Sequence, residues 1–79
     1  MKDFIVKTVK YLTDNPDKVS VDETENEGIT FYNITVDKAD MGKVIGKSGR
    51  IVKALRDLVR VKAIKAGLRV SLNVAEQQN

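Results

Sequence analysis

Apolar and polar positions alternate along this chain with two different periods, which predict three helices and three strands. Apolar residues recur at helical spacing in two long segments, and they alternate with polar residues at a period of two in three others. The predicted elements are, in chain order, a helix over residues 2–14, a strand starting at Val19, a strand over 29–36, a short helix over 41–45, a long helix over 50–66 and a strand over 68–74.

Residues that favour turns separate these segments. Asn15-Pro16 ends the first helix, because the residue before a proline is disfavoured in the α region. The acidic segment 23–28 is expected to form a turn or a solvated hairpin loop, Asp40 is placed to cap the short helix, and Gly67 to close the long one. The polar segment 76–79 is expected to be a frayed tail.

The alternating strands and the first helix predict which side chains face the core. Tyr32, Ile34 and Val36 share one side of the second strand and should face the helices. Phe4 and Tyr11 lie at helical spacing, which favours a place in the core or at its edge over a role as base-stacking rings.

The long helix carries more apolar surface than one sheet can cover. Its apolar residues spread over roughly half the circumference, whereas a helix on one sheet needs a stripe of about 100°. The excess predicts a second partner surface, most simply another copy of the chain; the alternative is a wide stripe covered by helix 2–14. Lys53, Arg56 and Arg60 are expected on the solvated side. The residues predicted for the dimer interface are Val52, Leu55, Val59 and Ala63.

A glycine-rich turn stands between the short and the long helix. Gly46 and Gly49 bracket Lys47 and Ser48, with Val44-Ile45 before them and a basic helix after them. Glycine accepts positive φ and close backbone approach, so such a turn can point several N–H groups and a helix N-terminus at one phosphate. Ser48 is expected to cap the long helix or fill the turn.

Charge is distributed unevenly along the 79 residues, which are expected to form one domain, 1–79. Residues 1–40 carry five lysines and nine acids, a net charge of −4, whereas 41–79 carry nine lysines or arginines and two acids, a net charge of +7. The positive half contains the glycine-rich turn, which favours a polyanionic partner over a merely solvated surface.

Several functional classes are excluded by what the sequence contains. It has no histidine and no cysteine, so the usual general base and thiolate chemistry are absent, and no enzyme, metal or cofactor is expected. The acidic residues of segment 22–27 are expected to be solvated. A P-loop would need glycine at Met41, and a dinucleotide fingerprint would need it at Val44. Without a signal-like or membrane-spanning run, the expected location is the cytoplasm.

The run Val44-Ile45-Gly46-Lys47-Ser48-Gly49-Arg50-Ile51 resembles the GXXG signature of KH domains, whose loop clamps about four nucleotides of backbone. Nearly end to end, the chain resembles small bacterial single-KH-domain RNA-binding proteins of the KhpA type. The resemblance implies an α+β fold of type II, α-β-β-α-α-β, with a three-stranded sheet and the helices on one face. It also implies a homodimer, or a heterodimer with a larger RNA-binding protein of the KH type.

The predicted function is therefore non-enzymatic binding of single-stranded RNA in bacterial RNA metabolism or post-transcriptional regulation. The alternative is a dimerisation adaptor whose contact with nucleic acid is incidental. Val44, Ile45 and Ile51 are assigned equally to a base groove and to the core, and Lys47, Arg50, Lys43 and Lys53 to phosphate charge. The predicted RNA-binding residues are Lys43, Val44, Ile45, Gly46, Lys47, Ser48, Gly49, Arg50, Ile51 and Lys53.

Overall fold

The computed structural model describes residues 1–77 and confirms the predicted order of helices and strands. Three short 3-10 turns lie between them, at Pro16–Lys18, Lys38–Asp40 and Lys47–Gly49. The helices and strands are α1 (Lys2–Leu12), β1 (Ser20–Asn26), β2 (Ile29–Val36), α2 (Met41–Ile45), α3 (Arg50–Lys65) and β3 (Arg69–Glu76).

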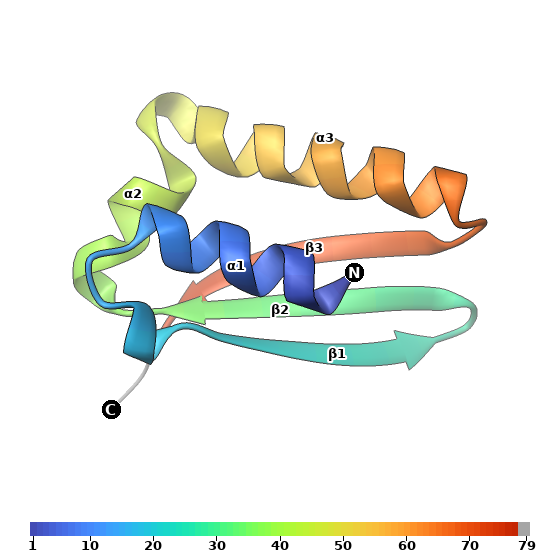
Figure 1. Cartoon of the computed structure of the whole chain (residues 1–79), viewed down its shortest axis with the longest axis horizontal. Coiled ribbons are helices and arrows are strands. Elements are labelled where there is room, and N and C mark those ends of the chain that lie inside the picture. The colour runs from blue at the N-terminus through green and yellow to red at the C-terminus, as the bar shows by residue number, and fades with distance from the viewer. Residues whose placement is uncertain (78–79) are drawn as a thin grey trace.

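The strands form one mixed sheet in the order β1-β2-β3. β1 and β2 form an antiparallel hairpin, and β3 returns parallel to β2, with Asn33 opposite Asn73. Figure 1 shows α1 and α3 on the same face of the sheet, and α2 at the end where β2 leaves it. β3 is an edge strand beside α3, so one of its sides has no strand partner.

The β1–β2 hairpin is longer than the alternation pattern predicts. Segment 23–28 was expected to be a turn or loop, but β1 continues to Asn26, where it pairs with Ile29. Only Glu27 and Gly28 form the connection, with φ values of 53° and 80°. Two left-handed residues make the tight turn whose twist matches paired strands, so the acidic residues before it lie on a strand.

The core lies between the sheet and the helices, as the periodicities predict. Tyr32, Ile34 and Val36 are buried under the helices, and Ile5 and Val9 of α1 are fully buried against them. Tyr11 is different, because its ring is 91% exposed and lies neither in the core nor at its edge. Among residues 1–77, no helix is both long and apolar enough to cross a membrane.

Asp40 does not cap α2 with its side chain, as had been expected. Its carboxylate is buried and accepts hydrogen bonds from the backbone N–H of Asp14 at 3.1 Å, and from the backbone N–H and Nδ2 of Asn15 at 3.0 and 3.2 Å. The loop after α1 lacks backbone partners for these donors, so the carboxylate supplies them. Asp40 thereby fixes the end of α1 beside α2.

The polar segment after residue 75 is more ordered than a frayed tail. β3 includes Glu76, and the backbone N–H of Gln77 donates to the carbonyl oxygen of Val36 at 2.7 Å. The last two residues of the predicted tail, 78 and 79, lie outside the described part of the chain.

Candidate nucleic-acid interface

The turn between α2 and α3 is built from three left-handed residues. Gly46 has φ 77° and ψ 175°, Ser48 has φ 57° and Gly49 has φ 72°. The N–H of Gly46 donates to the carbonyl oxygen of Gly42 at 2.9 Å, which closes α2, and the N–H of Gly49 donates to that of Gly46 at 3.2 Å. Figure 1 places this turn at the corner where α2 and α3 meet, away from the sheet.

Gly46 and Gly49 are required for different reasons. A Cβ on Gly46 would lie 2.5 Å from Cγ1 and 2.9 Å from Cβ and Cδ1 of Ile51, closer than side chains approach. A Cβ on Gly49 would meet nothing within 4 Å, so only its positive φ favours glycine. Gly46 therefore permits the first turn of α3 to pack back against the loop.

The amides of the turn divide into an engaged and an open set. The N–H groups of Gly46, Gly49 and Arg50 donate within the turn. Those of Lys47 and Ser48 make no backbone hydrogen bond in residues 1–77, and both residues are exposed. Ser48 does not cap α3, because the N-cap is Gly49 and it has no side-chain cap. The open amides stand beside the positive end of the α3 dipole.

Four basic residues surround this turn, and one of them has an acidic partner. Lys47, Arg50 and Lys53 are exposed and make no ion pair within the described part of the chain. Lys43 forms an ion pair with Asp14, and both side chains are substantially exposed. An exposed pair of this kind contributes only about 0–1 kcal/mol, so it leaves Lys43 able to exchange partners.

The apolar residues predicted for a base groove take different places. Val44 is fully buried and belongs to the core. Ile45 is half-buried and packs against the core, and Ile51 is 37% exposed beside Gly46. Of the three, Ile51 offers the most surface next to the turn.

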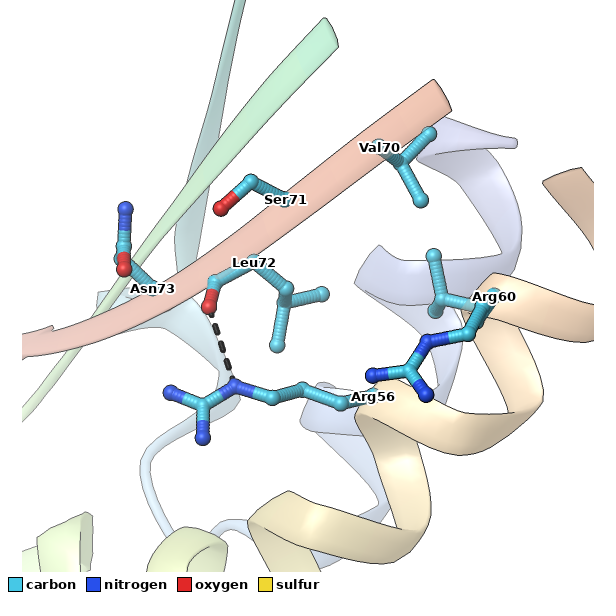
Figure 2. A pocket seen from close by; sticks show the side chains of 7 residues that line it. Arg56, Arg60, Val70, Ser71, Leu72 and Asn73 are labelled. Carbon is cyan, nitrogen blue, oxygen red and sulfur yellow. Dashed lines mark hydrogen bonds between the residues drawn. The ribbon is translucent and has the colours of Figure 1, made fainter. Parts of the chain in front are cut away.

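A hollow of about 240 Å³ lies further along α3, between that helix and β3. Its floor is apolar, and two arginines and the polar side of the edge strand form its walls (Figure 2). Nε of Arg56 donates to the carbonyl oxygen of Leu72 at 3.1 Å. The lining residues are Arg56, Val59, Arg60, Val70, Ser71, Leu72 and Asn73.

The sequence assigned Arg56 and Arg60 to a solvated side and did not predict the hollow. Their spacing of four residues puts them on one side of α3, which is a readable signal. Which element faces that side depends on the sheet order, because β3 must lie at the edge next to α3. Placing β3 there from sequence alone requires the topology.

Comparison with known proteins identifies the family. The family model described as "KhpA/KhpB, KH domain" matches residues 2–74. This chain belongs to that family. It is 46% identical over 76 residues to the RNA-binding protein KhpA of Aquifex aeolicus, covering 96% of each chain. It is 40% identical over 78 residues to KhpA of Chlamydia trachomatis, covering 99% of this chain and all of that one, and 40% identical over 76 residues to KhpA of Listeria monocytogenes, covering 96% and all.

The KhpA/KhpB relatives are bacterial and are named RNA-binding proteins, and the family is non-enzymatic. A solved structure of Era with MgGDPNP and nucleotides 1506–1542 of 16S ribosomal RNA has a similar fold, with a TM-score of 0.65 and 21% identity. Aquifex aeolicus Era Y63A bound to GDP·AlF4⁻ gives 0.67 and 20%. This chain is covered to 95% in each case and spans 29% of the Era chain. These likenesses support the KH fold.

The residues predicted for the dimer interface belong instead to the core of this KH fold. Their exposed fractions are 8% or less, since they form the side of α3 that packs on the sheet, and a buried side chain has little surface for a partner. The four residues are Val52, Leu55, Val59 and Ala63. The large apolar side chains that α3 leaves exposed are Ile51, Leu58, Val61 and Ile64; this set is called the outer apolar face below.

Proposed function

We propose that the chain is a non-enzymatic protein that binds single-stranded RNA through the turn 46–49 and the hollow between α3 and β3. The main support is the pair of open amides at Lys47 and Ser48, which are surrounded by cations at the N-terminus of a 16-residue helix. A phosphodiester meets both backbone donors and positive charge there. Relatives named RNA-binding proteins, at 40–46% identity over nearly the whole chain, add independent support.

In this proposal the two parts of the site have different tasks. The turn holds the sugar-phosphate backbone without regard to sequence, and Lys47, Arg50 and Lys53 displace counterions from it. Val59 and Leu72 form an apolar floor on which bases of the same strand lie, and the free edge of β3 offers backbone hydrogen bonds. A protein of this kind acts in the bacterial cytoplasm on RNA metabolism or post-transcriptional regulation.

The proposal is tested with the double variant Lys47→Asp/Ser48→Asp. It reverses charge at the open amides, and the turn should persist because aspartate tolerates the left-handed conformation of Ser48. The matched control, Lys18→Asp/Ser20→Asp, makes the same charge change at two exposed residues outside the turn and the hollow. Binding of a fluorescent single-stranded RNA is measured by anisotropy, with folding checked by circular dichroism.

The turn variant should weaken RNA binding at least about tenfold and the control much less, since only the former removes cations that neutralise phosphates. The slope of log Kd against log salt should also become shallower, by about 0.7 for each phosphate that the variant no longer neutralises. Equal affinity of the turn variant and the control, with both folded, would refute the proposed site.

A second proposal concerns self-association through the outer apolar face. Leu58, Val61 and Ile64 are 54%, 52% and 67% exposed, and exposed apolar side chains gathered on one helix are typical of a protein interface. At 100° per residue they lie on the side of α3 away from Arg56 and Arg60. A partner, either a second copy or a larger RNA-binding protein of the KH type, would therefore leave the hollow open.

Sedimentation of Leu58→Lys tests this association. The variant should sediment as a monomer at concentrations where the unchanged chain is a dimer, and Lys53→Glu, which alters charge outside the outer apolar face, should remain a dimer. If association persists in Leu58→Lys, the face is wrongly assigned. The same face favours the alternative function of a dimerisation adaptor. RNA crosslinking in cells that is unchanged in Lys47→Asp/Ser48→Asp would support that alternative.

A further inference from the structure

Arg56 is held in place between the helix and the edge strand of the hollow. Its Nε–H donates to the carbonyl oxygen of Leu72 at 3.1 Å, and Figure 2 shows the side chain reaching from α3 to β3. A guanidinium has five N–H groups in one plane, so this bond uses one and leaves four on the two terminal nitrogens. Within residues 1–77, Arg56 makes no other hydrogen bond and no ion pair.

The wall beside this guanidinium is the unpaired edge of β3. Gln77 directs its N–H toward Val36 of β2, so the backbone groups of alternate residues before it also face β2, and those of Leu72 face outward. The bond from Arg56 to the Leu72 carbonyl is consistent with that orientation. A base entering the hollow therefore meets a fixed planar array of donors next to a strand edge.

We propose that Arg56 determines base preference in this hollow, favouring a base that presents two adjacent hydrogen-bond acceptors. This rests on the proposed function, in which the hollow receives bases of a strand held at the turn. Cytosine presents N3 and O2 side by side, and guanine presents O6 and N7. Adenine and uracil place an N–H donor beside each acceptor, and a guanidinium, which has no acceptor, cannot satisfy that donor.

Arg60 serves as the internal comparison. It lies one turn further along α3, lines the same hollow and carries the same charge. It makes no side-chain hydrogen bond in the described residues, so its long side chain is not fixed in one plane. Preference for a base edge requires fixed geometry, whereas attraction to phosphate does not.

The experiment measures affinity for oligocytidylate, oligouridylate, oligoadenylate and an alternating guanosine–uridine repeat of equal length at one salt concentration. The unchanged chain should bind the cytidine or the guanosine ligand roughly 5- to 10-fold more tightly than the uridine and adenosine ligands, the lower range for a bidentate contact because the hollow is open to water. Replacing guanine by 7-deazaguanine removes N7 and separates the guanine contact from the cytosine contact.

Arg56→Lys keeps the charge but loses the planar fork, so the preference should fall to within about twofold while affinity for oligouridylate is unchanged. Arg60→Lys should retain the preference. In the unchanged protein, the terminal guanidinium NMR signals of Arg56 should shift with a preferred ligand and not with oligouridylate, which tests the contact without any substitution.

The outcomes separate this inference from the proposed function. Equal affinity for all four ligands, or a preference that survives in Arg56→Lys, would overturn the role of Arg56 while RNA binding at the turn stands. Failure of the unchanged chain to bind any of the four ligands would overturn both.

Discussion

Replacing Gly46 by alanine should destabilise the protein far more than the same change at Gly49. At Gly46 the added Cβ meets Ile51 at 2.5 Å, and the backbone, at φ 77° and ψ 175°, lies in a region essentially restricted to glycine. The backbone strain costs about 1–3 kcal/mol and the overpacking about 1–3 kcal/mol. The total of about 2–6 kcal/mol compares with a net stability of about 3–5 kcal/mol for a domain of this size.

Two other glycines separate these contributions. Gly49→Ala meets no neighbour and carries only the left-handed strain, about 1–2 kcal/mol. Gly42→Ala lies in α2, where a Cβ meets nothing within 4 Å and φ is not left-handed, so it should stabilise by about 0.8–1.0 kcal/mol. The order of stability should be Gly42→Ala, the unchanged chain, Gly49→Ala and Gly46→Ala.

Urea denaturation followed by far-ultraviolet circular dichroism gives this order. A double variant, Gly46→Ala with Ile51→Ala, isolates the clash because it removes the atoms that the new Cβ would meet. It should be more stable than the sum of the two single changes predicts by about 1–3 kcal/mol. The reasoning is refuted if Gly46→Ala unfolds at the same urea concentration as Gly49→Ala and the change at Ile51 brings no recovery.

Three further predictions concern stability. Burial raises the pKa of Tyr32 and the negative charge of the neighbouring Glu23 raises it further, so the native state retains a proton that the unfolded chain loses; the free energy of unfolding should therefore fall as pH rises above about 10, and Tyr32→Phe should remove that part of the slope in pH-dependent urea melts. Asp40→Asn should cost about 1–3 kcal/mol, because it puts an amide donor among the N–H donors that the carboxylate now accepts; a thermal melt equal to that of the unchanged chain would contradict it. Val59→Ala should cost about 2 kcal/mol and Leu58→Ala less than about 0.5 kcal/mol in urea melts at dilute protein, and equal costs would contradict the assignment of these two residues to the core and to the outer apolar face.

The elements were predictable from sequence because each has a local signal, and the outcome for α3 shows where such signals end. The wide apolar arc correctly indicated more surface than one sheet can cover, but nothing in a periodic pattern fixes which part of the arc meets the sheet. Packing decides that Leu55 is core and Leu58 is exposed. Asp40 was misassigned for a similar reason, since the donors that it satisfies lie 25 and 26 residues earlier in the chain.

The candidate site divides in the same way. The turn could be predicted because its residues are adjacent, and Gly46 and Gly49 have the left-handed φ that the motif requires. The hollow could not, because it exists only when β3 lies beside α3. Arg56 is then brought to Leu72, 16 residues later, by the topology and not by a local motif.

The parallel pairing of β2 with β3 also has a consequence for how the two halves of the site come into being. The loop 46–49 is closed by neighbours in sequence, whereas Asn33 and Asn73, which face each other across the strands, are 40 residues apart. A ribosome-bound chain that has emerged only through α3 already has the loop but lacks the second wall of the hollow. During synthesis, capacity to grip a phosphate chain therefore precedes any capacity to discriminate among bases, and the second arises only with closure of the most distant contact in the sheet.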